Sequence, residues 1–214
     1  MVPKVVGSRP IARPKYKKPK KASSGVFFIA IVKVMKYLGL LAVVILALGL
    51  TYIVAHWPEG KRKTFSQRVA VARHRVVYYI ALFSIALPLL LLFFLGWFVP
   101  EFGLSVWFSV FIVIAAIAQF ACTLIPETGG WRTQVHRTLA GISGVSLIPP
   151  LTLVLSVSTI SVPVEVLSII CAVIMVTTAY IALVSDEETD NFLNIQIVYY
   201  LAFFTPILYI SYLM

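Results

Sequence analysis

Three histidines are the residues of this chain whose possible chemistry is easiest to name. His56, His74 and His136 each stand next to a long apolar stretch, and the predicted topology places all three on the same side as Glu127. Three imidazoles and a carboxylate could ligate zinc and leave one position for an activated water. The spacing contains no two-histidine zinc motif of the H-E-x-x-H kind. Simple polar anchoring at a membrane interface is therefore the alternative interpretation of the same residues.

Sequence motifs for other kinds of chemistry are missing from the chain. No glycine-rich phosphate loop, dinucleotide fingerprint or kinase signature occurs, and no nucleophile elbow surrounds a serine. Haem ligation would need histidines that face one another inside a bundle, whereas these three all lie on one side. The sequence therefore predicts no cofactor.

The positions of the charged residues predict the elements that carry the histidines. Only 12% of the 214 residues are charged and 60% are hydrophobic, whereas a soluble domain carries about 25% charged residues. Six stretches of at least 20 residues contain no Asp, Glu, Lys or Arg. About 20 helical residues cross a hydrocarbon core of about 30 Å. Continuously apolar runs fit helices rather than the alternating strands of a barrel. The sequence thus predicts an all-α, polytopic transmembrane helical bundle.

The predicted transmembrane domain covers residues 26–214 and has six spans. They lie at approximately 37–57, 76–98, 104–124, 138–157, 164–184 and 194–214. The spans carry neutral polar side chains such as Gln119, Ser143 and Gln196, which could bind a headgroup or pair between helices. The uncharged stretches hold no ionisable relay, which argues against proton-coupled transport.

Residues 1–25 form a basic tail rich in proline. This tail has eight lysines and arginines and no apolar periodicity, so we expect it to be disordered. It could adsorb to the anionic headgroups of membrane lipids, contact nucleic acid, or serve only as a topology signal. Basic residues are nearly balanced between the two sides of the membrane. The tail tips the positive-inside rule towards cytoplasmic N- and C-termini in the cell membrane.

The fourth predicted span opens with small residues, Ala140, Gly141 and Gly144. Small residues four positions apart allow another helix to approach closely. They predict helix packing, either inside this bundle or against a second copy of the chain or another membrane protein.

Part of the chain resembles a known family. One predicted span ends in Thr123-Leu-Ile-Pro-Glu-Thr-Gly-Gly, His136-Arg-Thr-Leu-Ala opens the next, and Leu147-Ile-Pro-Pro lies inside it. This pattern resembles the membrane family called domain of unknown function 998, and Lys63-Thr-Phe-Ser resembles that family's first-loop serine motif. The resemblance implies a six-helix protein of unassigned activity.

The same resemblance implies which residues form a site, namely His136, Glu127 and Ser66, all on one side of the membrane. Gln67 and Arg68 stand where an acidic residue close after the serine is expected, which departs from the family pattern. We expect a protein that is not an enzyme and that binds, senses or scaffolds, with lipid as its ligand. The alternatives are a membrane-embedded hydrolase or metalloenzyme that uses this His/Glu/Ser cluster, and a passive small-solute transporter.

Overall fold

The computed structural model describes residues 23–59, 63–157, 161–184 and 191–213, and all regular structure in these ranges is helical. Its six long helices are α1 (Ser23–His56), α3 (Arg73–Phe93), α5 (Val106–Leu124), α6 (Gly130–Val154), α7 (Val162–Val184) and α8 (Phe192–Tyr212). Three short helices complete the fold: α2 (Phe65–Val69), the π-helix η1 (Phe94–Phe98) and α4 (Val99–Phe102). The predicted disordered tail lies outside the described residues up to position 22, and residues 23–25 already belong to α1.

Six helical segments are long and apolar enough to cross a membrane, which confirms the predicted all-α bundle. They are Val34–His56, Arg73–Phe102, Val106–Leu124, Gly130–Val154, Val162–Ala182 and Phe192–Tyr212. Two segments differ from the predicted spans by more than three residues at one boundary. The second continues through η1 and α4 until Gly103, whose φ of 59° ends it. The fourth begins eight residues earlier than predicted, because a helix can carry its charged first turns into the interface.

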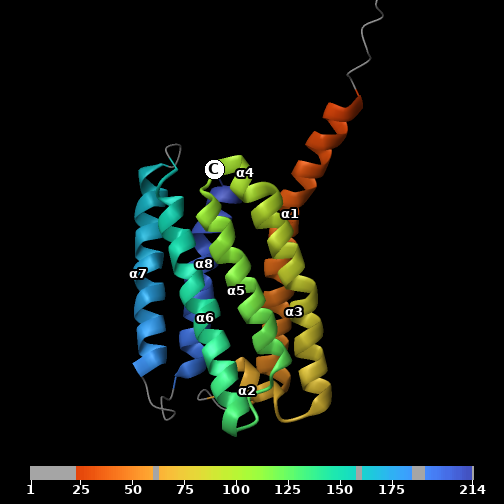
Figure 1. The fold of residues 1–214 in the computed structure, drawn as a ribbon, viewed down its shortest axis with the longest axis vertical. Coiled ribbons are helices and arrows are strands. Elements are labelled where there is room, and N and C mark those ends of the chain that lie inside the picture. Colours follow the sequence, from red (N-terminus) through yellow and green to blue (C-terminus); the bar gives the residue numbers. More distant parts are fainter. Residues whose placement is uncertain (1–22, 60–62, 158–160, 185–190, 214) are drawn as a thin grey trace, which may run out of the picture.

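Consecutive long helices pack against one another in chain order (Figure 1). α1 packs on α3, α3 on α5, α5 on α6, α6 on α7 and α7 on α8. The Tyr212 hydroxyl of α8 donates to the carbonyl of Lys36 in α1 and accepts from the amide of Leu40. The start and the end of the described bundle therefore meet at the same end of the molecule.

Aromatic rings fill that same end of the bundle around η1. Phe98 is fully buried, and its ring centroid lies 4.9 Å from that of Phe102 and 5.7 Å from that of Phe108. Helix α1 comes close to this cluster at Gly39, where an added Cβ would lie 2.5 Å from the ring of Phe93. This end is closed by tight packing.

Candidate functional site

The opposite end of the bundle is organised by α2, a short helix that begins with a capping box. The Thr64 hydroxyl accepts from the amide of Gln67 at 3.2 Å, and the Gln67 side-chain oxygen accepts from the amide of Thr64 at 3.0 Å. The two side chains satisfy backbone donors that a helix start otherwise leaves unpaired. The spacing Thr-x-x-Gln could have been read as this cap in the sequence. The cap fixes where the next side chains point.

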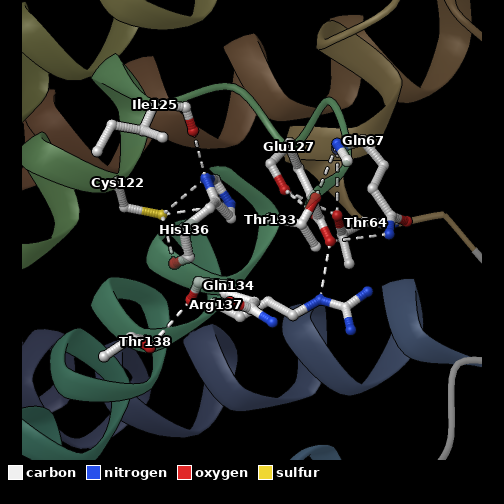
Figure 2. A network of polar contacts seen from close by, with 12 residues as sticks. Thr64, Gln67, Cys122, Ile125, Glu127, Thr133, Gln134, His136, Arg137 and Thr138 are labelled. Carbon is white, nitrogen blue, oxygen red and sulfur yellow. Dashed lines mark hydrogen bonds and ion pairs between the residues drawn. The ribbon is translucent and has the colours of Figure 1, made fainter. Parts of the chain in front are cut away.

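The Glu127 carboxylate, in the loop between α5 and α6, forms hydrogen bonds to residues of α2 and of α6 (Figure 2). It accepts from the Ser66 hydroxyl at 3.1 Å, from the side-chain amide Nε2 of Gln67 at 3.1 Å and from Nε of Arg137 at 2.9 Å. Ser66 Oγ and Thr64 Oγ1 lie 2.8 Å apart, and since Ser66 donates its only proton to Glu127, Thr64 must donate to Ser66. An ordered chain of hydroxyls therefore ends on a carboxylate that is 5% exposed.

His136 is buried, directly precedes Arg137 in α6, and is oriented by main-chain and sulfur contacts. Its Nδ1 lies 2.7 Å from the carbonyl oxygen of Ile125, and because a carbonyl only accepts, Nδ1 carries the proton. The Cys122 sulfur lies 3.4 Å from Nδ1 and 3.3 Å from Nε2. Nearly equal distances place the sulfur over the ring face, and its thiol donates to the His136 carbonyl at 3.6 Å. The pair is therefore not aligned as a thiol nucleophile with its base.

A polar cavity of about 940 Å³ joins the three residues that the family resemblance implies. Ser66, Glu127 and His136 all line it, and Ser66 and Glu127 are hydrogen-bonded directly. Its wall extends from Arg137 to Leu147 along α6, a distance of about 15 Å at the helical rise. The cavity therefore reaches from the loops into the membrane-spanning part of the bundle.

The small residues at the start of α6 form part of the cavity wall. Ala140, Gly141 and Gly144 all line it. A Cβ added at Gly141 would meet no atom within 4 Å, and one at Gly144 would lie 3.9 Å from the Tyr199 hydroxyl. The absence of side chains at these positions leaves space for the cavity. Closer helix approaches occur at Gly39 and Gly49 of α1, where the nearest side-chain atoms are 2.5 Å from an added Cβ.

The other two histidines lie in a different environment from His136. The His56 ring stacks on Tyr52 with centroids 4.1 Å apart, and His74 meets Trp57 edge-on at 6.2 Å. Both are exposed at the surface. Within the described residues there is no group of three or more His, Cys, Asp or Glu side chains placed to hold a metal ion. The three histidines are therefore not brought together.

Two arginines, one buried and one partly buried, hold the connection between α1 and α3. Arg68 is 3% exposed and donates to the carbonyls of Lys63 at 3.3 Å and Trp57 at 3.0 Å, and burial lowers the pKa of its guanidinium. Arg75 donates to Glu59 at 3.3 Å. A hydrogen bond from Lys63, opposed by burial, together with the charges of Lys63 and Arg75, lowers the pKa of Glu59. The sequence pattern predicts none of these contacts.

A second cavity, of about 540 Å³, lies beside the polar one and is lined almost entirely by apolar side chains. Among its lining residues only Thr51, Gln119, Ser143, Tyr200 and Thr205 carry polar side-chain atoms. The wall includes residues of α1, α3, α5, α6 and α8. Cavities of this size are typical of sites for small ligands.

The two cavities meet at four residues that line both: Gln119, Ser143, Leu147 and Tyr200. The single hydroxyl proton of Ser143 is shared between two acceptors, the carbonyl of Ala115 at 3.1 Å and the side-chain oxygen of Gln119 at 3.3 Å. The lining of the two cavities therefore changes from polar near the loops to apolar within the membrane-spanning helices.

The apolar cavity also reaches the surface of the bundle. Its lining includes the exposed residues Ala47, Thr51 and Ala55 of α1 and Leu201 and Thr205 of α8. These positions lie inside two of the six segments that are long enough to span a membrane. The cavity therefore opens towards the bilayer between α1 and α8.

These features define the class of the molecule: an integral membrane protein whose described residues form six helices of membrane-spanning length, with a polar cavity at one end and an apolar cavity beside it. Comparison with protein-family models, with curated proteins and with solved structures finds no match for this chain. The family resemblance noted in the sequence stays a prediction.

Proposed function

We propose that this protein binds a single membrane amphiphile, with its headgroup in the polar cavity and its acyl chain in the apolar cavity. The observation that carries the proposal is that the two cavities adjoin at four shared lining residues, so that a polar lining and an apolar lining lie side by side; these residues are Gln119, Ser143, Leu147 and Tyr200. An amphiphile has the same division along its length. The opening between α1 and α8 would let the chain enter from the bilayer.

A passive transporter would need polar groups in both halves of the membrane. In the part of the chain described, the polar cavity extends along α6 to Ser143 and Leu147, and the neighbouring cavity is lined almost entirely by apolar side chains. This arrangement favours retention of a ligand at one depth over passage of a small solute. The most economical role is therefore binding, sensing or presenting a lipid.

The proposal is tested by filling each cavity separately. Gly141→Leu adds a side chain to the polar cavity where no atom lies within 4 Å of the new Cβ, and Ala116→Leu reduces the apolar cavity. Native mass spectrometry of the purified proteins should show the bound lipid lost in both. Ile142→Phe, on the exposed face of α6, is the matched control and should keep it. Equal lipid occupancy in all three variants would contradict the proposal.

A second candidate function is hydrolysis of an ester bond in the bound amphiphile. The specific observation is the Ser66 hydroxyl donating to the Glu127 carboxylate at 3.1 Å inside the cavity, a nucleophile beside a base. Incubation with a monoacylglycerol should then release free fatty acid, and Ser66→Ala and Glu127→Gln should each abolish the release. No release by the unmodified protein would leave Ser66 and Glu127 as groups that position α2.

We also propose that both termini face the cytoplasm, so that the polar cavity opens on the outer side. The support is the basic tail together with the contact between Lys36 and Tyr212, which places the two ends of the bundle on one side. Cys122 and Cys171 are buried, so Gln134→Cys at an exposed position of α6 introduces one accessible thiol. A membrane-impermeant maleimide should label it in intact cells. Labelling only after permeabilisation would reverse the orientation.

A further inference from the structure

The charges that line the polar cavity are already paired within the protein. Lys63 forms an ion pair with Glu59, and Arg137 forms one with Glu127 at 2.9 Å. Among the described residues these are the two cationic side chains of the cavity wall. A phosphate headgroup would therefore have to compete with a carboxylate for each cation. Burying a charge without a dedicated partner is costly.

Uncharged groups of the cavity keep hydrogen-bonding capacity. The proton on Nδ1 of His136 is committed to Ile125, so in the neutral ring Nε2 carries a lone pair. Within the described part of the chain, the Cys122 sulfur is the one hydrogen-bond contact of Nε2, and it lies over the ring face. Nε2 can therefore accept from a hydroxyl.

Two more neutral groups lie where the cavities meet. The Tyr200 hydroxyl and the Gln119 amide nitrogen have no hydrogen-bond partner among the described residues, although both residues line the two cavities. The neighbouring Tyr199 differs, since its hydroxyl donates to the carbonyl of Gly144. A ligand that reaches this junction meets one hydroxyl and one side-chain amide nitrogen that have no internal partners. These groups suit hydroxyl and ester oxygens.

We infer that the headgroup bound in the polar cavity is uncharged and carries free hydroxyls, as in an acylglycerol. The inference rests on the proposed function and names the ligand class of the same site. His136 accepts from a headgroup hydroxyl, while Tyr200 and Gln119 donate to the ester at the start of the acyl chain. Selectivity against phosphate follows because both cations of the wall are neutralised by Glu59 and Glu127.

Two lipids that differ by one phosphate test the inference: monooleoylglycerol and oleoyl lysophosphatidic acid. Each is titrated against the full-length protein in detergent, and binding is followed by native mass spectrometry. The basic tail and loops attract anionic lipid without a specific site. Only binding that Gly141→Leu removes is therefore attributed to the cavity. We expect monooleoylglycerol to bind this site at least about tenfold more tightly than its phosphate counterpart.

The Tyr200→Phe variant sharpens the test because its lost hydroxyl has no internal partner to disturb. It should weaken monooleoylglycerol binding by about three- to tenfold, the effect of one hydrogen bond, with an unchanged unfolding temperature. Tyr209→Phe, on an exposed part of the same helix, is the matched control and should bind normally.

The outcomes separate this inference from the proposed function. Preference for monooleoylglycerol, reduced in Tyr200→Phe, supports the uncharged headgroup. Equal or tighter cavity binding of lysophosphatidic acid overturns it and leaves amphiphile binding intact. If Gly141→Leu changes the binding of neither lipid, the proposed function fails and this inference fails with it.

Discussion

The two ends of this bundle solve the packing problem in opposite ways. Around η1, the rings of Phe93, Phe94, Trp97 and Phe98 pack against one another and against α1. Around α2, hydrogen bonds and ion pairs hold the helices apart around a cavity of about 940 Å³. Close packing excludes a ligand, whereas a polar frame supports an open space. Close packing around η1 holds the helices together, and the end around α2 can therefore keep an open cavity.

The largest expected effect is at the closed end. Phe98→Ala removes a fully buried ring from the aromatic cluster and should lower the free energy of unfolding by about 3–5 kcal/mol. Phe120→Ala, on an exposed part of α5, is the matched control and should have a small effect. Thermal unfolding in detergent measures both. Similar losses in the two variants would mean that the closed end is not the stabilising one.

At the hollow end the frame depends on Glu127. Glu127→Ala leaves Ser66, Gln67 and Arg137 without their common acceptor and should destabilise the protein by about 1–3 kcal/mol. Glu101→Ala changes an exposed carboxylate and should be nearly neutral. Unfolding by denaturant distinguishes the two, and an unchanged midpoint for Glu127→Ala would show that the frame carries no stability.

A pair of glycine substitutions sets the two ends directly against each other. Gly39→Ala places a methyl group 2.5 Å from the Phe93 ring and should destabilise by about 1–3 kcal/mol through overpacking. Gly141→Ala enters open space and should stabilise by about 0.5–1 kcal/mol, because alanine favours a helix over glycine. We expect the unfolding temperature to fall in Gly39→Ala and to rise in Gly141→Ala, relative to the unmodified protein. A loss of stability in both would mean that the start of α6 is also closely packed.

The smallest expected effect is a pH dependence from the loop that joins α1 and α3. The hydrogen bond from Lys63 holds the pKa of Glu59 below its ordinary value of 4.5. The folded protein therefore binds this proton less readily than the unfolded chain does. The stabilisation is fully present above pH 4.5 and is lost as the pH falls through the lowered pKa.

The Glu59 contribution should be below about 1 kcal/mol, since Lys63 is half exposed. The free energy of unfolding of Glu59→Gln, measured between pH 7 and pH 3, is the test. The difference from the unmodified protein should shrink towards pH 3. A constant difference would remove Glu59 from the forces that hold this loop.

The sequence alone determined the class of fold. Charged side chains are too costly inside hydrocarbon to be placed at random, so the six uncharged stretches mark the spans to within a few residues at most boundaries. The end of the second spanning segment and the start of α6 were less predictable, because a helix can continue through Trp97 and Pro100 or start at Gly130 without any change in the hydrophobic pattern. The capping box at Thr64 is a local Thr-x-x-Gln motif that the sequence analysis missed.

Only the tertiary structure decided what the candidate residues do. Ser66 and Glu127 are 61 residues apart and meet because α2 lies against the loop between α5 and α6, an arrangement that no local spacing encodes. The fold also gives the three histidines different neighbours: His56 and His74 contact aromatic rings, whereas His136 contacts the carbonyl of Ile125. In the sequence, the small residues Gly141 and Gly144 are equally compatible with close packing of a neighbouring helix and with a space for a ligand. The positions of the neighbouring helices decide between these two possibilities, and here they leave a cavity beside both glycines.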